Sequence, residues 1–244
     1  MVRKAILIND VGTEKNRIQA TKKDVFNFKR FLKSNTGGAW LDSEIYEIYN
    51  NTDIINSIHR ITNNCDYTIT MVSSHGCISE SNNKLYVEIN GEDYQEICFQ
   101  NNSKRQLIIF DCCRTYSKII NVPKLKTFSV DSYKLNISKL YREVYNSYIE
   151  ESDMGIITLY SCEPGYASSM NGDGSFFINS LIDAADYYKN KKEILYINEA
   201  LKLSKELIKK YNKLQTPEMQ QIKMKKFFPF AIYINQSQFT EYMN

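Results

Sequence analysis

Two apolar, β-branched runs end abruptly in reactive side chains: Thr70-Met71-Val72-Ser73-Ser74-His75-Gly76 and Leu107-Ile108-Ile109-Phe110-Asp111-Cys112-Cys113-Arg114. Runs of this kind are typical of the buried strands of a parallel sheet. In a sheet that alternates strands with helices, ligands and chemistry gather at the carboxyl ends of the strands. Neighbouring strands would therefore bring a histidine and a cysteine to one place. The chain has only two histidines, His59 and His75, so few residues compete for that role.

Further short apolar runs alternate with segments of helical period along the whole chain. They predict strands at 5–8, 45–49, 67–73, 106–110, 156–160 and 228–234, and helices at 25–32, 53–63, 137–151, 176–188 and 194–211. This order predicts an α/β fold with a single doubly wound, mostly parallel six-stranded sheet flanked by helices. Leu85–Ile89, followed by Asn90-Gly91, predicts a small β-hairpin arm outside that sheet. Because no repeat or linker divides residues 1–244, we expect one domain.

The composition is that of a folded globular protein, with 43% hydrophobic and 24% charged residues. The net charge of +3 is too small to indicate nucleic acid or a membrane surface as a partner. No apolar run reaches the roughly 18 to 20 residues that span a membrane. The six cysteines form no CxxC pair, which favours reduced thiols in the cytoplasm over a disulfide framework or a zinc site. No metal and no cofactor is predicted.

The connection between the fourth and fifth strands, residues 115–153, is unusually long. Long connections in compact domains are usually functional or mobile. Its lysines include Lys124, Lys126, Lys134 and Lys139, so it is either an activation or autocleavage loop or an ordinary crossover with surface lysines. The lysine-rich stretch 189–226 is most simply the solvated side of a helix, and binding of a nucleotide or nucleic-acid activator there is the less favoured interpretation.

His75 and Cys113 have the chemistry of a nucleophile and its base. A thiolate attacks a carbonyl far better than a thiol does, so a cysteine hydrolase needs a histidine to take the proton. The backbone N–H groups of Gly76 and Cys113 could stabilise the oxyanion, and Gly76 allows a sharp turn. Taken singly, a cysteine at a strand end is more often an inert buried thiol, and a lone histidine is more often structural.

A third block strengthens this interpretation: Tyr160-Ser161-Cys162-Glu163-Pro164-Gly165-Tyr166, followed by Asp173-Gly174-Ser175-Phe176-Phe177-Ile178-Asn179-Ser180-Leu181. Together with the two opening runs, it resembles the caspase and metacaspase family of cysteine peptidases. The chain departs from the caspase signature in two ways. The histidine lies 38 residues before Cys113 rather than about 50, and Asp111 stands where the signature has glutamine.

The resemblance implies a caspase-like fold in which Cys113 is the nucleophile and His75 the general acid/base. The amides of Gly76 and Cys113 would form the oxyanion hole. Cys112 would pack in the core, because adjacent side chains of a strand point to opposite faces. The resemblance also divides the domain into a large-subunit-like part (1–115), a connecting loop and helix (116–154) and a small-subunit-like part (155–244).

Substrate specificity is where the departures matter. Metacaspases, which cut after arginine or lysine, have an aspartate at the position of Asp111 and another that Asp24 resembles. Met170 stands where aspartate-cutting caspases have an arginine, and Arg17 lies near the place of another. We therefore expect cleavage after Arg or Lys, with an Asp-specific protease as the alternative. The resemblance places further substrate-binding residues at Ser161, Ala167, Ser168, Ser169 and Met170.

Three functions remain open from the sequence. The first is an active endopeptidase acting on proteins or peptides, a regulated effector of cell death or defence that an activating partner or ligand could control. The second is a catalytically silent caspase-like adaptor. The third is a ligand-binding signalling domain, although the chain has no GxGxxG or GxxxxGK loop. Metacaspases often need calcium bound by clustered aspartates. The sequence contains no convincing acidic cluster and leaves calcium dependence and oligomeric state open.

Overall fold

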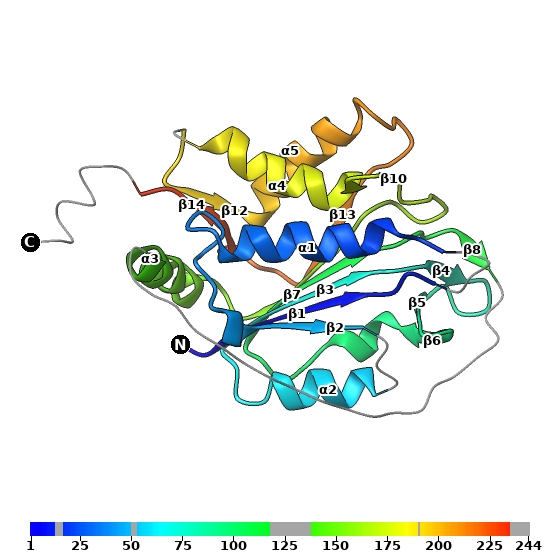
Figure 1. Cartoon of the computed structure of the whole chain (residues 1–244), viewed down its shortest axis with the longest axis horizontal. Helices are drawn as coiled ribbons and strands as arrows, with labels where there is room; N and C mark the ends of the chain where they lie inside the picture. Colours follow the sequence, from blue (N-terminus) through cyan, green and yellow to red (C-terminus); the bar gives the residue numbers. More distant parts are fainter. Residues whose placement is uncertain (13–16, 50–52, 118–137, 190, 235–244) are drawn as a thin grey trace, which may run out of the picture.

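A six-stranded sheet of order β13-β9-β7-β3-β1-β2 forms the centre of the computed structural model, which describes residues 1–244 except 13–16, 50–52, 118–137, 190 and 235–244 (Figure 1). Five strands are parallel, and β13 pairs antiparallel with β9. The strands are β1 (Arg3–Asn9), β2 (Ile45–Ile48), β3 (Tyr67–Ser73), β7 (Arg105–Asp111), β9 (Gly155–Tyr160) and β13 (Glu218–Gln221). The predicted mostly parallel α/β sheet is thereby confirmed.

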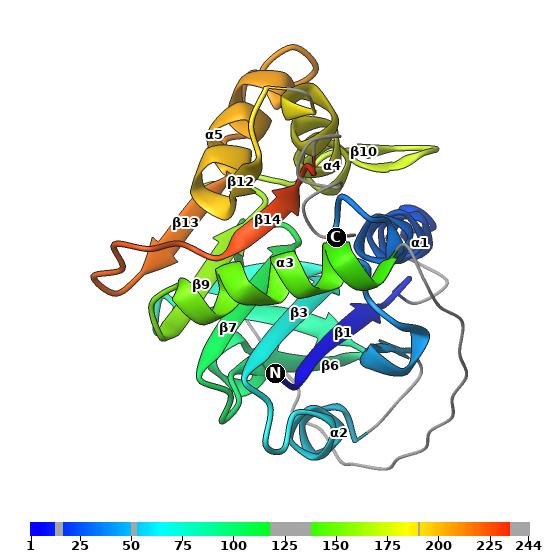
Figure 2. The ribbon, with the colours of Figure 1, turned by 90° about the vertical axis from the view of Figure 1, so that its left-hand side faces the viewer.

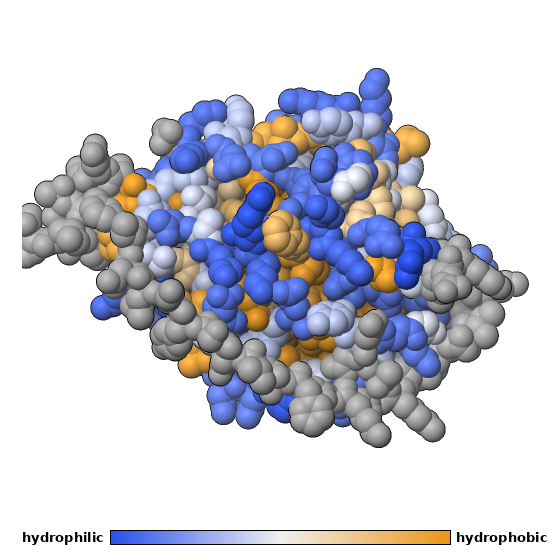
Figure 3. All heavy atoms as spheres, viewed as in Figure 1, coloured by the Kyte–Doolittle hydropathy of each residue, from blue (hydrophilic) through white to orange (hydrophobic). Residues whose placement is uncertain are grey.

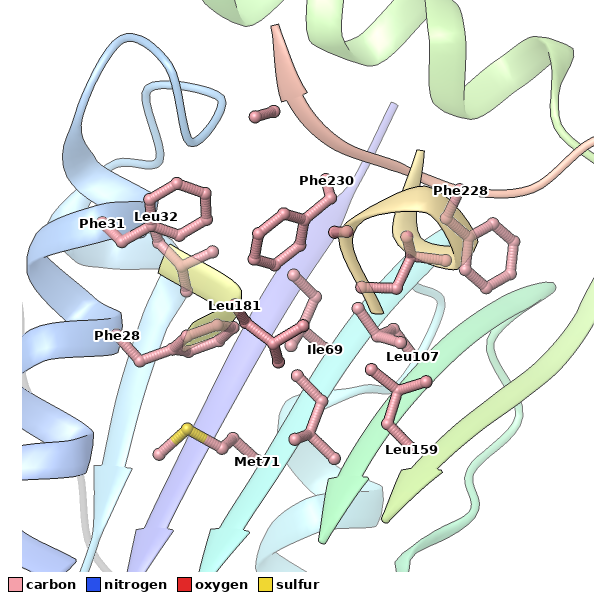
Figure 4. Close-up of a cluster of buried hydrophobic side chains, with 14 of the residues drawn as sticks. Phe28, Phe31, Leu32, Ile69, Met71, Leu107, Leu159, Leu181, Phe228 and Phe230 are labelled. Carbon is pink, nitrogen blue, oxygen red and sulfur yellow. The ribbon is translucent and has the colours of Figure 1, made fainter. Parts of the chain in front are cut away.

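Helices cover both faces of this sheet. They are α1 (Ala20–Lys33), α2 (Ile54–Ile61), α3 (Ser138–Glu151), α4 (Phe176–Tyr188) and α5 (Ile197–Ile208), with short 3-10 turns η1 (Asp42–Glu44) and η2 (Glu96–Phe99). In Figure 2, α4 and α5 lie on one side of the sheet and α2 on the other. This arrangement follows from the geometry of the strands, because adjacent side chains of a strand point to opposite faces of the sheet. Met71 belongs with Phe28 and Leu181 to the larger core (Figure 4). The next residue, Val72, belongs with Ile58 to the smaller core on the other face.

A small second sheet of order β6-β5-β4-β8 lies beyond the carboxyl ends of the main strands. Its strands are β4 (Gly76–Ser79), β5 (Leu85–Ile89), β6 (Glu92–Gln95) and β8 (Tyr116–Ser117). The predicted hairpin arm is confirmed as β5 and β6, joined by Asn90 and Gly91 at φ 56° and 78°. Two positive φ angles in succession are what a tight hairpin turn requires. This small sheet begins directly after His75.

The sixth strand of the main sheet differs from the prediction. Residues 228–234 contain β14 (Pro229–Ile232), which pairs antiparallel with β12 (Ile194–Tyr196) in a separate two-stranded ribbon. The main sheet instead ends in β13, whose sequence Glu-Met-Gln-Gln has one apolar residue. As an edge strand pairing only with β9, it needs no continuous apolar run. The predicted helix 194–211 likewise divides into β12 and α5.

The long connection contains the predicted helix as α3 (Ser138–Glu151), which ends at the predicted residue. Its Tyr145 and Ile149 are buried against the larger core. Lys139 lies in α3, whereas Lys124, Lys126 and Lys134 lie outside the described residues, as does most of the proposed autocleavage loop.

Buried charges join α3 to the start of the chain. Arg3 is 1% exposed, donates through Nη2 to the Gly38 carbonyl at 2.7 Å and pairs with Glu44 at 3.5 Å. Arg142 of α3 contacts the same Glu44 carboxylate through two hydrogen bonds. Burial acts to raise the pKa of Glu44, but its hydrogen bonds from Arg142 and the charge of Arg3 outweigh burial, and the pKa is lowered.

Candidate active site

The His75 and Cys113 loops leave adjacent parallel strands at the same level. Ser73, the last residue of β3, is the register partner of Asp111, the last residue of β7. The Ser74 N–H donates to the Asp111 carbonyl at 3.2 Å, so the pairing continues past the strand ends. His75 and Cys113 each follow two residues after this paired position, and both are half-buried. The sheet therefore brings the two predicted residues to one edge, as parallel strands do.

Gly76 lies directly against the cysteine loop. A Cβ built on Gly76 would lie 2.7 Å from Cys112 Sγ, 2.9 Å from Cys112 Cβ and 3.0 Å from the Cys113 carbonyl oxygen. These distances are too short for any side chain, so glycine is required here for close approach. Cys112 is 2% exposed and fills this contact, whereas Cys113 is half-buried.

The Cys113 thiol lies in a partly desolvated environment. Burial raises its pKa, the nearby Ser168 N–H lowers it, and the Asp111 carboxylate raises it. The net direction is upward, so the thiol keeps its proton near neutral pH. A reactive thiolate at this position therefore requires a base that accepts the proton during the reaction.

Asp111 is 4% exposed, and its carboxyl points into the interior beside the site. The Ser168 hydroxyl donates to Asp111 Oδ1 at 2.8 Å, and Oδ2 is buried without a hydrogen-bond partner among the described residues. Burial raises the pKa of Asp111, while the hydroxyls of Ser175, Ser168 and Ser161 lower it. Burial prevails, so the pKa of Asp111 is raised.

Asp24, from α1, lies close to Asp111. It is 1% exposed and accepts from the Ser73 hydroxyl at 2.8 Å and from the Ser175 N–H at 2.6 Å. A Cβ on Gly174 would lie 2.6 Å from Asp24 Oδ1, so the chain passes very near this carboxyl. Burial and the neighbouring Asp111 raise the pKa of Asp24 to about 7. The structure thus assembles two buried carboxyl groups from residues 87 positions apart in sequence.

The segment that follows β9 forms one wall of the site. Ser161 is fully buried, and its hydroxyl bridges the backbone N–H and carbonyl of Cys112 at 3.2 and 2.9 Å, so it supports the cysteine loop from behind. Ala167 is exposed, Ser168 and Ser169 are half-buried, and Met170 is 37% exposed at the start of β10 (Met170–Asn171), which pairs with β11 (Gly174–Ser175).

Three further residues support the site, although the sequence assigned them no role. Gln215 is fully buried, accepts from the Ser169 N–H at 3.1 Å and donates to the Ser161 carbonyl at 3.0 Å. Gln215 therefore holds the segment from Ser161 to Ser169 in place, although it lies in a loop without a recognisable motif. Ser175, which interacts with both carboxyl groups, is the N-cap of α4, and its hydroxyl accepts a hydrogen bond from the Ile178 N–H. A serine directly before an apolar helical run is a recognisable N-cap pattern.

Arg114 is the third, and it anchors the cysteine loop. It is 6% exposed, bonds through Nη1 to Glu218 at 2.6 Å and to the Cys162 carbonyl at 2.9 Å, and stacks over Tyr160. Its backbone N–H donates to the Tyr166 carbonyl at 2.9 Å, which ties the loop to the wall segment. Arg17, by contrast, lines a groove along α1 with Lys29 and Glu47.

Among the residues that the structure describes, no three histidine, cysteine or carboxylate side chains gather in a way that could hold a metal ion. Within the same residues, no helix is long and apolar enough to cross a bilayer. All six cysteines are free thiols.

Comparisons with known proteins agree with the fold. Residues 2–229 match the family model described as the caspase domain of Peptidase_C14. The structure resembles that of caspase-1 from Spodoptera frugiperda, with a TM-score of 0.55, 13% sequence identity and coverage of 90% of this chain and 85% of that chain. No curated protein matches. At 13% identity the structural match supports only the fold. The family model spans nearly the whole chain and therefore identifies the family. This chain belongs to the caspase-domain family and is a cysteine-type peptidase.

Proposed function

We propose that this cysteine peptidase is an endopeptidase that uses Cys113 as nucleophile and His75 as general acid/base, and that it cleaves after Arg or Lys. The observation that carries the specificity is the pair of buried carboxyl groups, Asp24 and Asp111, beside the Cys113 loop. The nucleophile and base rest on the strand register that sends both loops to one edge of the sheet.

The reaction follows from the chemistry of these groups. His75 accepts the Cys113 proton as the sulfur attacks the scissile carbonyl carbon, and the carbonyl π electrons move to its oxygen. The N–H groups of Gly76 and Cys113 are suited to stabilise this oxyanion. As the tetrahedral intermediate collapses, the C–N bond breaks and His75 returns the proton to the departing amine. Water, deprotonated by His75, then cleaves the thioester and restores the Cys113 thiol.

The carboxyl pair explains a preference for a basic side chain. Burial raises the pKa of both carboxyl groups, and repulsion from Asp111 raises that of Asp24 further, which leaves part of the pair protonated. A guanidinium or ammonium group in the site would stabilise both ionised forms, and arginine could bond bidentately. An acidic side chain would add a third negative charge. The site therefore favours arginine or lysine and opposes aspartate.

Fluorogenic peptides that differ only in the residue before the cleaved bond test this specificity. We expect kcat/KM for arginine and lysine peptides to exceed that for the aspartate peptide by at least a hundredfold. Preference for the aspartate peptide would overturn the assignment of Asp24 and Asp111.

A covalent arginyl ketone probe tests the nucleophile independently. We expect it to label wild type and Cys112→Ala at the same residue, Cys113, and to leave Cys113→Ala unlabelled. His75→Ala should label much more slowly, because the thiol then lacks its base. Labelling at Cys112, or equal labelling in the absence of Cys113, would contradict the proposal.

Because the family implies protein substrates, the proposal includes a biological role. The peptidase would be a regulated effector of cell death or defence in the cytoplasm, where a thiol nucleophile stays reduced. Toxicity on expression in host cells tests this role, with Cys113→Ala as the matched control. Toxicity that persists in Cys113→Ala would separate it from peptidase activity.

A further inference from the structure

A groove of about 910 Å³ runs along the outer side of α1, over the carboxyl ends of β1 and β2. Figure 3 views the face that carries α1 and β2 and shows hydrophilic side chains around small apolar patches. The groove falls in the range of small-molecule sites. Its lining residues are Asn9, Val11, Gly12, Arg17, Lys22, Val25, Phe26, Lys29, Arg30, Lys33, Glu47 and Tyr49.

The groove is strongly cationic. Five of its lining side chains are basic, and only one, Glu47, is acidic. Glu47 pairs with Lys29 at 2.7 Å, and Asp42 pairs with Lys33 at 2.7 Å. The three other basic side chains, Arg17, Lys22 and Arg30, have no acidic partner within 4 Å among the described residues. The net charge of +3 conceals this local excess, so the sequence-level argument against an anionic partner does not apply to this surface.

Two aromatic rings stand in the same groove and are open to solvent. Phe26 is 58% exposed on α1, and Tyr49 is 65% exposed after β2. The Arg30 guanidinium lies 5.9 Å from the centroid of the Phe26 ring. An exposed ring beside cations that have no acidic partner among the described residues is the combination that stacks a base while the cations hold phosphate. Cations alone would suit any acidic chain, but the rings favour a planar partner.

Helical spacing places four of the lining residues in a row along α1. Lys22, Phe26, Lys29 and Lys33 follow at intervals of four, three and four residues, so they share one face of α1. Lys23 lies on another face and lines a different groove, between α1 and α4. Asp24 is also turned away, toward Ser73 and Ser175. The basic and aromatic stripe is therefore separate from the carboxyl pair.

We propose that this groove binds a nucleotide that carries two or more phosphates. Lys22, Arg30 and Arg17 contact the phosphoryl oxygens, and the base stacks on the rings of Phe26 and Tyr49. The site is independent of the proposed peptidase function, because its residues lie outside the His75, Cys113 and carboxyl-pair machinery.

Equilibrium binding to the full chain at 150 mM salt tests the proposal with three probes: ATP, inorganic tripolyphosphate, which lacks the base, and an oligoglutamate peptide. We expect ATP to bind at least tenfold more tightly than tripolyphosphate or the peptide. Lys22→Glu should weaken ATP binding at least tenfold, whereas the matched charge reversal Lys23→Glu should change it less than twofold.

The aromatic part is tested by Phe26→Leu, which keeps every charge and removes the ring. It should weaken ATP binding at least fivefold and leave tripolyphosphate binding unchanged. These side chains are exposed, so the substitutions leave the core intact, and thermal unfolding checks this. The proposal is overturned by a wild-type chain that does not bind ATP, by equal effects of Lys22→Glu and Lys23→Glu, or by tighter binding of the peptide, which would make the groove a docking site for acidic chains.

Discussion

Replacing Asp24 by asparagine should stabilise the protein and disable it at the same time. Asp24 has an ordinary pKa of 3.8 that rises to about 7 in the folded chain, mainly through burial and then through Asp111. At 1.36 kcal/mol per pH unit, this displacement costs the folded state at most about 4 kcal/mol above pH 7. Asparagine keeps the acceptor for the Ser175 N–H and can donate to the Ser73 hydroxyl, so it removes the charge without leaving a buried group unpaired.

The sign of the effect follows from the direction of the pKa change. A carboxyl group whose folded-state pKa is raised stabilises the fold below its unfolded pKa, near 4, and this contribution is lost as the pH rises toward 7. Urea unfolding should therefore show Asp24→Asn within about 1 kcal/mol of wild type at pH 4 and up to about 4 kcal/mol more stable at pH 8. The exposed Asp173→Asn serves as the control and should show no such trend.

The peptidase activity of Asp24→Asn should fall although its stability rises. Loss of one buried partner of a charged substrate group costs at least about 2 kcal/mol, so kcat/KM for the arginine peptide should fall at least about thirtyfold in Asp24→Asn. In wild type the same activity should decline as the pH falls below 7, because Asp24 becomes protonated. A stability difference that does not vary with pH, or an unchanged arginine kcat/KM, would refute the reasoning.

Three further substitutions test other parts of the site and the fold. Gly76→Ala places a Cβ 2.7 Å from the nearest sulfur, and we expect a lower Tm and at least a hundredfold lower kcat/KM, so unchanged kinetics would contradict the tight loop contact. Ser168→Ala removes the hydrogen bond that lowers the pKa of Asp111, so the acid limb of the arginine-peptide pH profile should move to higher pH and not to lower. Glu44→Gln leaves the buried Arg3 short of its counter-charge, and urea unfolding should show a loss of about 3 to 5 kcal/mol, whereas a neutral effect would contradict the importance of this ion pair for the fold.

The sequence predicts those parts of the fold in which apolar periodicity determines burial. Tyr67–Ser73 is a strand buried on both faces, and Phe176–Tyr188 is a helix with a serine N-cap, so both were predicted with the observed bounds. Glu218–Gln221 was missed because an edge strand is held by backbone pairing with β9, which leaves no pattern in its side chains. Residues 228–234 were placed in the wrong sheet, because their apolar run fits a two-stranded ribbon equally well.

The residues of the candidate site likewise differ in how well the sequence predicts them. His75 and Cys113 follow two strands that end in Ser73 and Asp111, so periodicity and parallel topology were enough to predict that these loops meet at one edge. Asp24 was found only through a family resemblance, since nothing local in α1 marks a residue that faces Asp111. Gln215 left no signal, because its bonds to Ser169 and Ser161 depend on a loop conformation that only the tertiary structure reveals.

The pairing of β3 with β7 limits how this peptidase could be switched on and off. The two strands are in register from Tyr67 with Arg105 to Ser73 with Asp111, at the centre of the sheet. Separating β3 from β7 would mean melting that centre, which is too costly for a reversible signal. The wall around Ser168 and Ser169 is held mainly by side-chain hydrogen bonds, so regulation of the proposed peptidase site would act through the order of this wall rather than through the strands that precede His75 and Cys113.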